Sequence, residues 1–311
     1  MGQILDIVLP VFGLAALGLA AVKLKILPLS VGDGLSAYVF ALAVPALIFR
    51  TLSTGEMPSA SPWAYWIAYF AGVATVWALA MLAARRLFAR DTREAVVHGF
   101  SAGQSNTVLF GIPLIVTAYG EAGAVPLFLL IAVHLPIVMA TATILMQVAE
   151  GGRGGLASLK AFAVSLVANP IIIGIVAGGV ARLLGVTAPG ALGDVVDMLA
   201  ASAAPVALVA MGMTVARYGG RGDIGPAVLL TALKLMVHPF IVWVLAFHVL
   251  EMPPVFAAVA VLFASLPTGV NAYLVAARYG TGESASSSVV SLTTVASVVT
   301  VTFWLWVIGA S

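Results

Sequence analysis

Long apolar stretches separated by short polar connections run along almost the whole chain. A helix that crosses a bilayer needs about 20 mainly apolar residues. Ten stretches are long enough, at about 4–22, 34–52, 63–84, 95–118, 123–147, 161–183, 190–215, 224–249, 254–277 and 286–309. The connections hold most of the charged residues. The pattern predicts an all-α membrane protein with ten transmembrane helices.

Two of these stretches contain residues that interrupt a helix. They are Ser105, Asn106, Thr107, Gly111 and Pro113 in the fourth stretch, and Pro267, Thr268, Gly269 and Asn271 in the ninth. Proline removes an amide donor and glycine weakens a helix. Non-helical backbone inside a membrane is tolerated where protein or a water-filled cavity satisfies it, as at the substrate sites of secondary transporters. The alternative is a proline-kinked helix with a structural asparagine.

An internal repeat appears at an offset of 160 residues. Pro10 matches Pro170, Gly18 matches Gly178, Pro45 matches Pro205, and Tyr119-Gly120 matches Tyr279-Gly280. Residues 1–160 then form a first repeat and 161–311 a second, each with five spans. Because five is odd, the second repeat enters the membrane upside down, which predicts an inverted repeat. The repeat also places the two interruptions opposite each other.

Composition and charge support a membrane protein. The chain is 62% hydrophobic and 8% charged, whereas soluble domains are about 25% charged. There is no cysteine, so no disulfide or thiolate metal site is expected, and a net charge of +2 gives no indication of nucleic acid binding. Trp63, Trp66, Trp304 and Trp306 are interpreted as interfacial residues.

The basic residues predict the orientation in the membrane, since cytoplasmic loops are rich in lysine and arginine. Eleven lie on one side of the predicted spans: Lys23, Lys25, Arg85, Arg86, Arg90, Arg93, Arg153, Lys160, Arg217, Arg221 and Arg278. Two, Arg50 and Arg182, lie on the other. The first side is therefore expected to be cytoplasmic. We expect an inner (plasma) membrane protein with both termini on the non-cytoplasmic side.

The chain resembles the auxin efflux carrier family, which includes bacterial transporters of malonate-like acids and the plant PIN auxin exporters. The similar residues are Ser105-Asn106-Thr107, Gly111-Ile112-Pro113-Leu114 and Tyr119-Gly120, then Leu266-Pro267-Thr268-Gly269, Ala276 and Tyr279-Gly280, together with Lys234-Leu235 and Pro239. The chain departs from the plant proteins at Ser105, where they have proline, and it lacks the long cytoplasmic loop of many plant members.

This resemblance implies a ten-span fold shared with bile acid:sodium symporters, in which broken helices four and nine cross near the membrane centre. Spans 1, 2, 6 and 7 would form a scaffold, and spans 3–5 and 8–10 a transport domain. Transport of a small organic anion across the lipid bilayer would proceed by elevator-type alternating access. A homodimer is left open.

The interruptions supply the candidate binding residues. Asn106 offers two donors and one acceptor, and a helix that starts after it presents free amides and a positive dipole end to a carboxylate. Ser105, Thr107, Thr268 and Asn271 are further candidates for hydrogen bonds to the substrate. For each asparagine the alternative is a helix cap.

Lys234 is the one basic residue well inside a predicted span, and His238 follows on the same helix face. We expect Lys234 to face a cavity and attract the anion. The alternatives are a side chain that extends to the membrane surface and a packed lysine with a backbone carbonyl partner. His134 is interpreted as a hydrogen-bonded structural residue rather than a proton carrier.

The leading functional hypothesis is a secondary carrier of small organic anions. A sodium-coupled symporter of the bile acid type and a channel are the alternatives. No cofactor is expected, although sodium coupling through carbonyls and hydroxyls stays open. An enzyme is not expected, because the sequence has no His-Glu-x-x-His motif and no pair of carboxylates deep in a span.

Overall fold

The computed structural model describes residues 2–54, 62–152, 168–186, 190–218 and 222–309, and these residues form helices and no β-strand. The α-helices are α1 (Gly2–Lys23), α2 (Leu29–Tyr38), α3 (Val44–Thr54), α4 (Trp63–Arg86), α5 (Thr92–Gly103), α6 (Ile112–Ala149), α8 (Pro170–Leu183), α9 (Ala191–Tyr218), α10 (Ile224–Ala232), α11 (His238–Trp243), α12 (Pro254–Ser265), α13 (Asn271–Tyr279) and α14 (Glu283–Val307). Four π-helical segments join some of them: η1 (Val39–Ala43), η2 (Thr107–Gly111), η3 (Leu233–Val237) and η4 (Val244–Val249).

Seven helices of the described residues are long and apolar enough to cross a membrane. The end of the predicted fourth span and the predicted fifth span both lie in α6, whose helical backbone is interrupted between them at Gly120, where φ is 56° and ψ is −141°. The helices α8 and α12 are shorter than a span. Part of the predicted span 161–183 lies outside the described residues, as do Arg153, Lys160 and Arg221. An all-helical membrane protein is confirmed; the count of ten stays a prediction.

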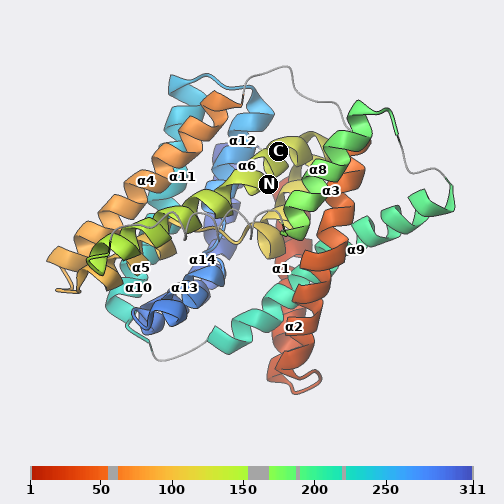
Figure 1. Cartoon of the computed structure of the whole chain (residues 1–311). Helices are drawn as coiled ribbons and strands as arrows, with labels where there is room; N and C mark the ends of the chain where they lie inside the picture. Colours follow the sequence, from red (N-terminus) through yellow and green to blue (C-terminus); the bar gives the residue numbers. More distant parts are fainter. Residues whose placement is uncertain (1, 55–61, 153–167, 187–189, 219–221, 310–311) are drawn as a thin grey trace.

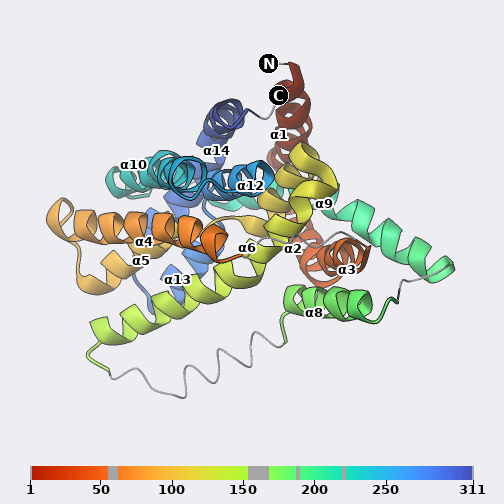
Figure 2. The ribbon, with the colours of Figure 1, turned by 90° about the horizontal axis from the view of Figure 1, so that it is seen from above.

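The helices divide into two groups. In Figure 2, α1, α2, α3, α8 and α9 lie on one side, while α4, α5, α10, α12 and α13 lie on the other. Figure 1 shows α6 running between the two groups. Within the first group, the hydroxyl of Tyr38 at the end of α2 lies 2.7 Å from the hydroxyl of Ser202 in α9 and is hydrogen-bonded to it. Two ion pairs also connect α9 to α2 and α3, Arg217 with Asp33 and Arg50 with Asp197.

Close packing in the first group depends on two glycines. A Cβ on Gly18 of α1 would lie 2.1 Å from the carbonyl oxygen of Val209 in α9. A Cβ on Gly178 of α8 would lie 3.1 Å from the carbonyl oxygen of Phe49 in α3. Adding 160 to the number of Gly18 gives Gly178, and subtracting 160 from the number of Val209 gives Phe49. The repeat offset thus converts the first contact into the second. The same repeat offset therefore relates two contacts in space as well as four motifs in sequence.

One expected surface residue is buried. Trp304 is 2% exposed, and its indole N–H donates to the carbonyl of Leu235 over 2.9 Å. The interpretation of Trp304 as an interfacial residue is therefore wrong, because α14 turns this side chain toward η3. Trp63 and Trp306 are exposed, at 67% and 62%.

Candidate functional site

Two non-helical segments meet inside the second group of helices. One, Gln104–Asn106, lies between the end of α5 at Gly103 and the start of η2 at Thr107. The other, Leu266–Val270, lies between the end of α12 at Ser265 and the start of α13 at Asn271. The backbone N–H of Asn106 donates to the carbonyl of Pro267 over 2.8 Å. Residues far apart in sequence thus satisfy each other's backbone groups.

Gln104 forms a second link between the two segments. Its side-chain oxygen accepts from the backbone N–H of Gly269 at 2.7 Å, and its side-chain nitrogen donates to the carbonyl of Ser105 at 2.8 Å. A Cβ on Gly269 would lie 2.7 Å from Gln104, so this approach requires glycine. Gln104 is 2% exposed. Its buried side chain therefore links the two segments through one hydrogen bond to each.

Gly111 and Pro113 lie beyond the first interruption rather than in it. Pro113 follows η2 directly, where the helix has already begun, because Ile112 before it still donates its N–H to the carbonyl of Thr107. Gly111 ends η2, and a Cβ there would lie 2.7 Å from Leu266. These two residues shape the restart of the helix, whereas Pro267 and Gly269 lie within the second interruption.

Lys234 is fully buried against both interruptions. Its Nζ donates to the carbonyl of Ala264 at 2.6 Å and to the hydroxyl of Ser105 at 2.9 Å, and lies 3.3 Å from Nδ1 of His238. The carbonyl of Ala264 belongs to the last turn of α12, whose negative dipole end favours a positive group. Extension of the side chain to the membrane surface is therefore wrong, and the packed lysine with a backbone carbonyl partner describes the geometry.

A buried histidine, His134, also contacts Ser105 in the first interruption. His134 of α6 accepts from the backbone N–H of Ser105 at 3.2 Å through Nε2 and lies 3.0 Å from the hydroxyl of Tyr69 through Nδ1. Nε2 must carry a lone pair to accept this bond, so the proton of the neutral ring is on Nδ1, which donates to the hydroxyl oxygen of Tyr69. The prediction of a hydrogen-bonded His134 is confirmed.

Asn106 and Thr107 lie on the side of the first interruption that faces α9 of the first group. Both are half-buried, unlike Ser105. The side-chain nitrogen of Asn106 donates to the sulfur of Met211 in α9 over 3.1 Å. Asn106 makes no side-chain cap to η2. The first amides of a helix have no intrahelical partner, and they carry its positive end.

Thr268 and Asn271 occupy different surroundings. Thr268 is buried; its hydroxyl donates to the carbonyl of Ser101 at 2.9 Å, and its N–H donates to the hydroxyl of Thr293 at 3.0 Å. Asn271 is half-buried and begins α13. Thus the structure brings together Ser105, Lys234 and His238 in the interior, and places Asn106, Thr107 and Asn271 nearer accessible space.

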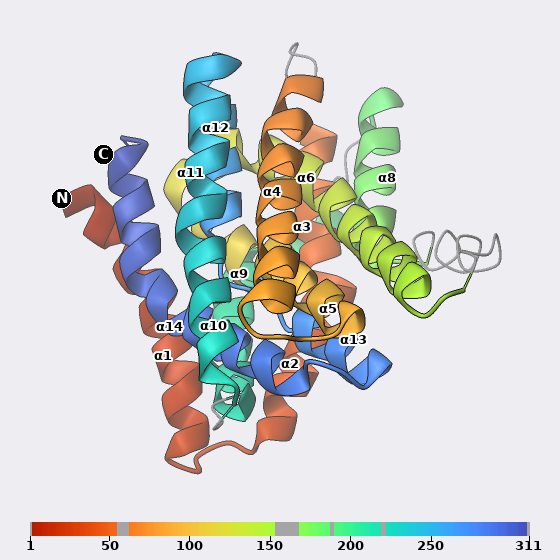
Figure 3. The same cartoon turned by 90° about the vertical axis from the view of Figure 1, so that its left-hand side faces the viewer.

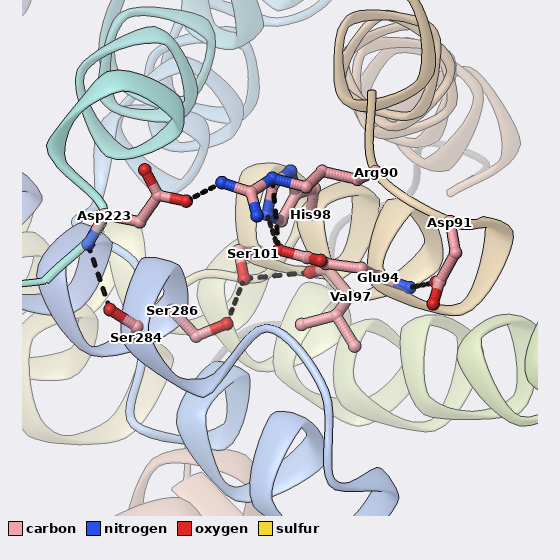
Figure 4. A network of polar contacts seen from close by, with 9 residues as sticks. All are labelled: Arg90, Asp91, Glu94, Val97, His98, Ser101, Asp223, Ser284 and Ser286. Carbon is pink, nitrogen blue, oxygen red and sulfur yellow. Dashed lines mark hydrogen bonds and ion pairs between the residues drawn. The ribbon is translucent and has the colours of Figure 1, made fainter. Parts of the chain in front are cut away.

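Residues 99–103 read Gly-Phe-Ser-Ala-Gly, a pattern that in hydrolases holds a nucleophilic serine on a strand-to-helix turn. Here the five residues lie inside α5. The hydroxyl of Ser101 donates to the carbonyl of Val97 and lies 3.2 Å from the hydroxyl of Ser286 (Figure 4). Ser101 therefore packs two helices together and is not presented to a substrate.

The same face of α5 continues to a charged cluster at its start. Arg90 contacts Asp223 and Glu94, and Glu94 lies 3.6 Å from His98 (Figure 4). Asp223 directly precedes α10, and its N–H donates to the hydroxyl of Ser284 in α14. This cluster holds the starts of three helices together. In the part of the chain that the structure describes, no group of three His, Asp or Glu residues could hold a metal ion.

Two residues beside the contact between the interruptions had no clear signal in the sequence. Tyr69 and Met211 come from apolar helices in which one aromatic or methionine is unexceptional. Gln104 had a usable signal, because an uncharged amide directly before an interruption is well suited to bond its free backbone groups.

Comparison with known proteins also indicates a membrane transporter. The sequence matches the membrane transport protein family over residues 3–305. It is also 30% identical to a Rhizobium meliloti (strain 1021) protein named "Putative malonate transporter", over 99% of this chain and 97% of that protein. The resemblance to the auxin efflux carrier family is thereby confirmed, and transport rather than enzymatic activity follows. The chain belongs to the membrane transport protein family, as a multi-pass membrane transporter.

Proposed function

We propose that this transporter is a secondary carrier of small organic anions, with malonate-like dicarboxylates as the first class to test. The observation that carries the proposal is the contact between the two interruptions, where the N–H of Asn106 meets the carbonyl of Pro267. Two helices start beside this contact, at Thr107 and Asn271. Their free amides and positive dipole ends suit a carboxylate. The name of the R. meliloti relative supports the same class.

The proposed architecture is a ten-span inverted repeat with crossed broken helices. The contacts of Gly18 with Val209 and of Gly178 with Phe49 support it, because the repeat offset exchanges them. In this arrangement residues 1–160 and 161–311 are the two repeats. Spans 1, 2, 6 and 7 form the scaffold, and spans 3–5 and 8–10 form the transport domain. The termini lie on the non-cytoplasmic side.

The proposed mechanism is elevator-type alternating access. The bond between Asn106 and Met211 crosses from the transport domain to the scaffold. An anion bound at Asn106 and Thr107 would take the place of this thioether contact and move with the transport domain past α9. The buried contacts of Ser105, Lys234 and Gln104 would hold the crossing rigid during this movement.

The test is counterflow of radiolabelled malonate in proteoliposomes. Vesicles loaded with unlabelled malonate should accumulate the label transiently and saturably, while protein-free vesicles should not. Mono- and tricarboxylates serve as competitors. Uptake that does not saturate and shows no counterflow would favour a channel and overturn the carrier. No uptake of any carboxylate would overturn the anion class.

A sodium arm distinguishes the bile acid type of symporter. The same assay is run with sodium or with choline outside the vesicles, at equal ionic strength. We expect counterflow to be unchanged, because the buried hydroxyls of Ser105 and Thr268 already bond within the protein. A loss of counterflow without sodium would establish the symporter instead.

A further inference from the structure

An apolar cavity lies on the outside of the second group, between α4 and α6. Its volume is about 760 Å³, and α4 lines it from Trp63 to Met81 while α6 lines it from Val133 to Leu145. Thr141 contributes a hydroxyl, but this group donates to the carbonyl of Ile137 in its own helix. The indole N–H of Trp66 is likewise bonded, to the carbonyl of Leu129. The indole N–H of Trp77 is buried without a partner among the described residues, and apart from this donor the walls are apolar and suit an apolar ligand rather than the anion of the carrier site.

The cavity has the length of a membrane leaflet or more. At 1.5 Å per residue, the part of α4 from Trp63 to Met81 is about 27 Å long, and the hydrocarbon core of a bilayer is about 30 Å thick. The two helices are bonded together at the Trp63 end, through Tyr65 with Pro126 and Trp66 with Leu129. Figure 3 shows them separating toward the other end of α4. A long chain can therefore enter from the end where α4 finishes.

The floor of the cavity is built from a buried tryptophan. Trp77 is 5% exposed and packs edge-on against Phe100 of α5. A Cβ on Gly99 of α5 would lie 2.3 Å from the Trp77 ring. Glycine at this position lets the ring sink toward α5, which leaves room above it. The hollow is therefore shaped by the packing of Trp77 against Gly99 and Phe100.

Two arginines stand at the open end. On α4 the lining residues Trp77 and Met81 are four apart, and Arg85 is the next residue on the same face. Arg85 and Arg86 are exposed. Arg90 and Arg93 nearby are paired with Asp223, Glu94 and Glu150. Arg85 donates to the backbone carbonyl of Arg90 at 3.3 Å, but neither Arg85 nor Arg86 forms an ion pair with a described carboxylate. Guanidinium groups bind phosphate by paired hydrogen bonds.

We propose that this cavity binds an anionic phospholipid, with an acyl chain between α4 and α6 and the phosphate on Arg85 and Arg86. The apolar walls, the length and the unpaired positive charge at one end match the two chemical parts of such a lipid. The bound lipid fixes the angle between α4 and α6, and so supports the helices that position Tyr69 and His134.

The test is native mass spectrometry of purified protein in the presence of phosphatidylglycerol and phosphatidylcholine. The wild type should retain phosphatidylglycerol about tenfold more strongly, because both lipids offer a phosphate to the arginines but the choline cation of phosphatidylcholine offsets the charge of its phosphate. The variant Arg85→Gln/Arg86→Gln should lose this preference. The control variant Lys23→Gln/Lys25→Gln, which removes two other exposed basic residues from the same predicted side, should keep it. Equal losses in both variants would overturn the site and show general surface attraction.

A second pair of variants tests the acyl chain. Ala78 lines the cavity and is exposed, so Ala78→Trp fills it without changing the interior. Retention of phosphatidylglycerol should fall about tenfold in Ala78→Trp. Leu79→Trp is the control, because the adjacent Leu79 is exposed but does not line the cavity. Unchanged retention in Ala78→Trp would overturn the proposal, as would equal binding of a phosphatidylglycerol whose acyl chains are too short to reach Trp77.

Discussion

Gln104 offers the sharpest test of the contact between the two interruptions. Its side chain bonds the N–H of Gly269 and the carbonyl of Ser105. In Gln104→Leu the volume is nearly kept while both bonds are lost. Two backbone groups are then left buried without these partners, so the change isolates the polar contribution from the loss of packing.

The expected cost follows from the two bonds. A buried donor or acceptor that loses its partner costs about 1–3 kcal/mol, so Gln104→Leu should lower the free energy of unfolding by about 2–6 kcal/mol. The matched control is Thr294→Val in α14. The hydroxyl of Thr294 donates to the carbonyl of Val290 one turn earlier, and that carbonyl also accepts a helical N–H. No backbone group is orphaned in the control, so it should cost less than about 1 kcal/mol.

The assay is unfolding in denaturing detergent or by heat, with purified protein in lipid nanodiscs. Gln104→Glu adds a further comparison, because it keeps an acceptor for Gly269 but sets a carboxylate oxygen against the carbonyl of Ser105. It should destabilise at least as much as Gln104→Leu. If Gln104→Leu is no more destabilising than Thr294→Val, Gln104 does not hold the two segments together and the crossing geometry is refuted.

Four further predictions concern packing, binding and orientation. Gly18→Ala should destabilise by about 1–3 kcal/mol through overpacking against α9, whereas Gly179→Ala, with no atom within 4 Å of the new Cβ, should stabilise by up to about 1 kcal/mol; similar unfolding of both variants would contradict this packing. Asn106→Ala should weaken malonate binding by about 1.5–3 kcal/mol in calorimetry, and unchanged affinity would reduce Asn106 to a helix terminus. Lys234→Met should abolish counterflow and leave the carbonyl at the end of α12 unbonded, at about 1–3 kcal/mol; wild-type rates would remove Lys234 from the mechanism. A cytoplasm-dependent fluorescent protein fused to Ser311 should stay dark, and fluorescence would show a miscounted span.

The sequence alone was sufficient for the features that depend on local chemistry. Apolar length predicts membrane helices wherever the run is unbroken, as in α1, α4 and α9. The second interruption was also predictable, because Pro267 and Gly269 disfavour a helix whatever surrounds them. The first was placed too far along the chain, since the helix restarts at Thr107 and continues through Pro113, and the break depends instead on what Gln104–Asn106 can bond.

The tertiary structure decided which groups bond across the fold. Nothing near Lys234 in sequence indicates that its partner is the carbonyl of Ala264, because α12 reaches η3 only after the chain has folded back. The burial of Trp304 and the link from Gln104 to Gly269 have the same origin. Apolar length and helix propensity can be read from residues that are neighbours in the chain. The partner of a buried polar group depends instead on which distant helix the packing brings within hydrogen-bonding distance.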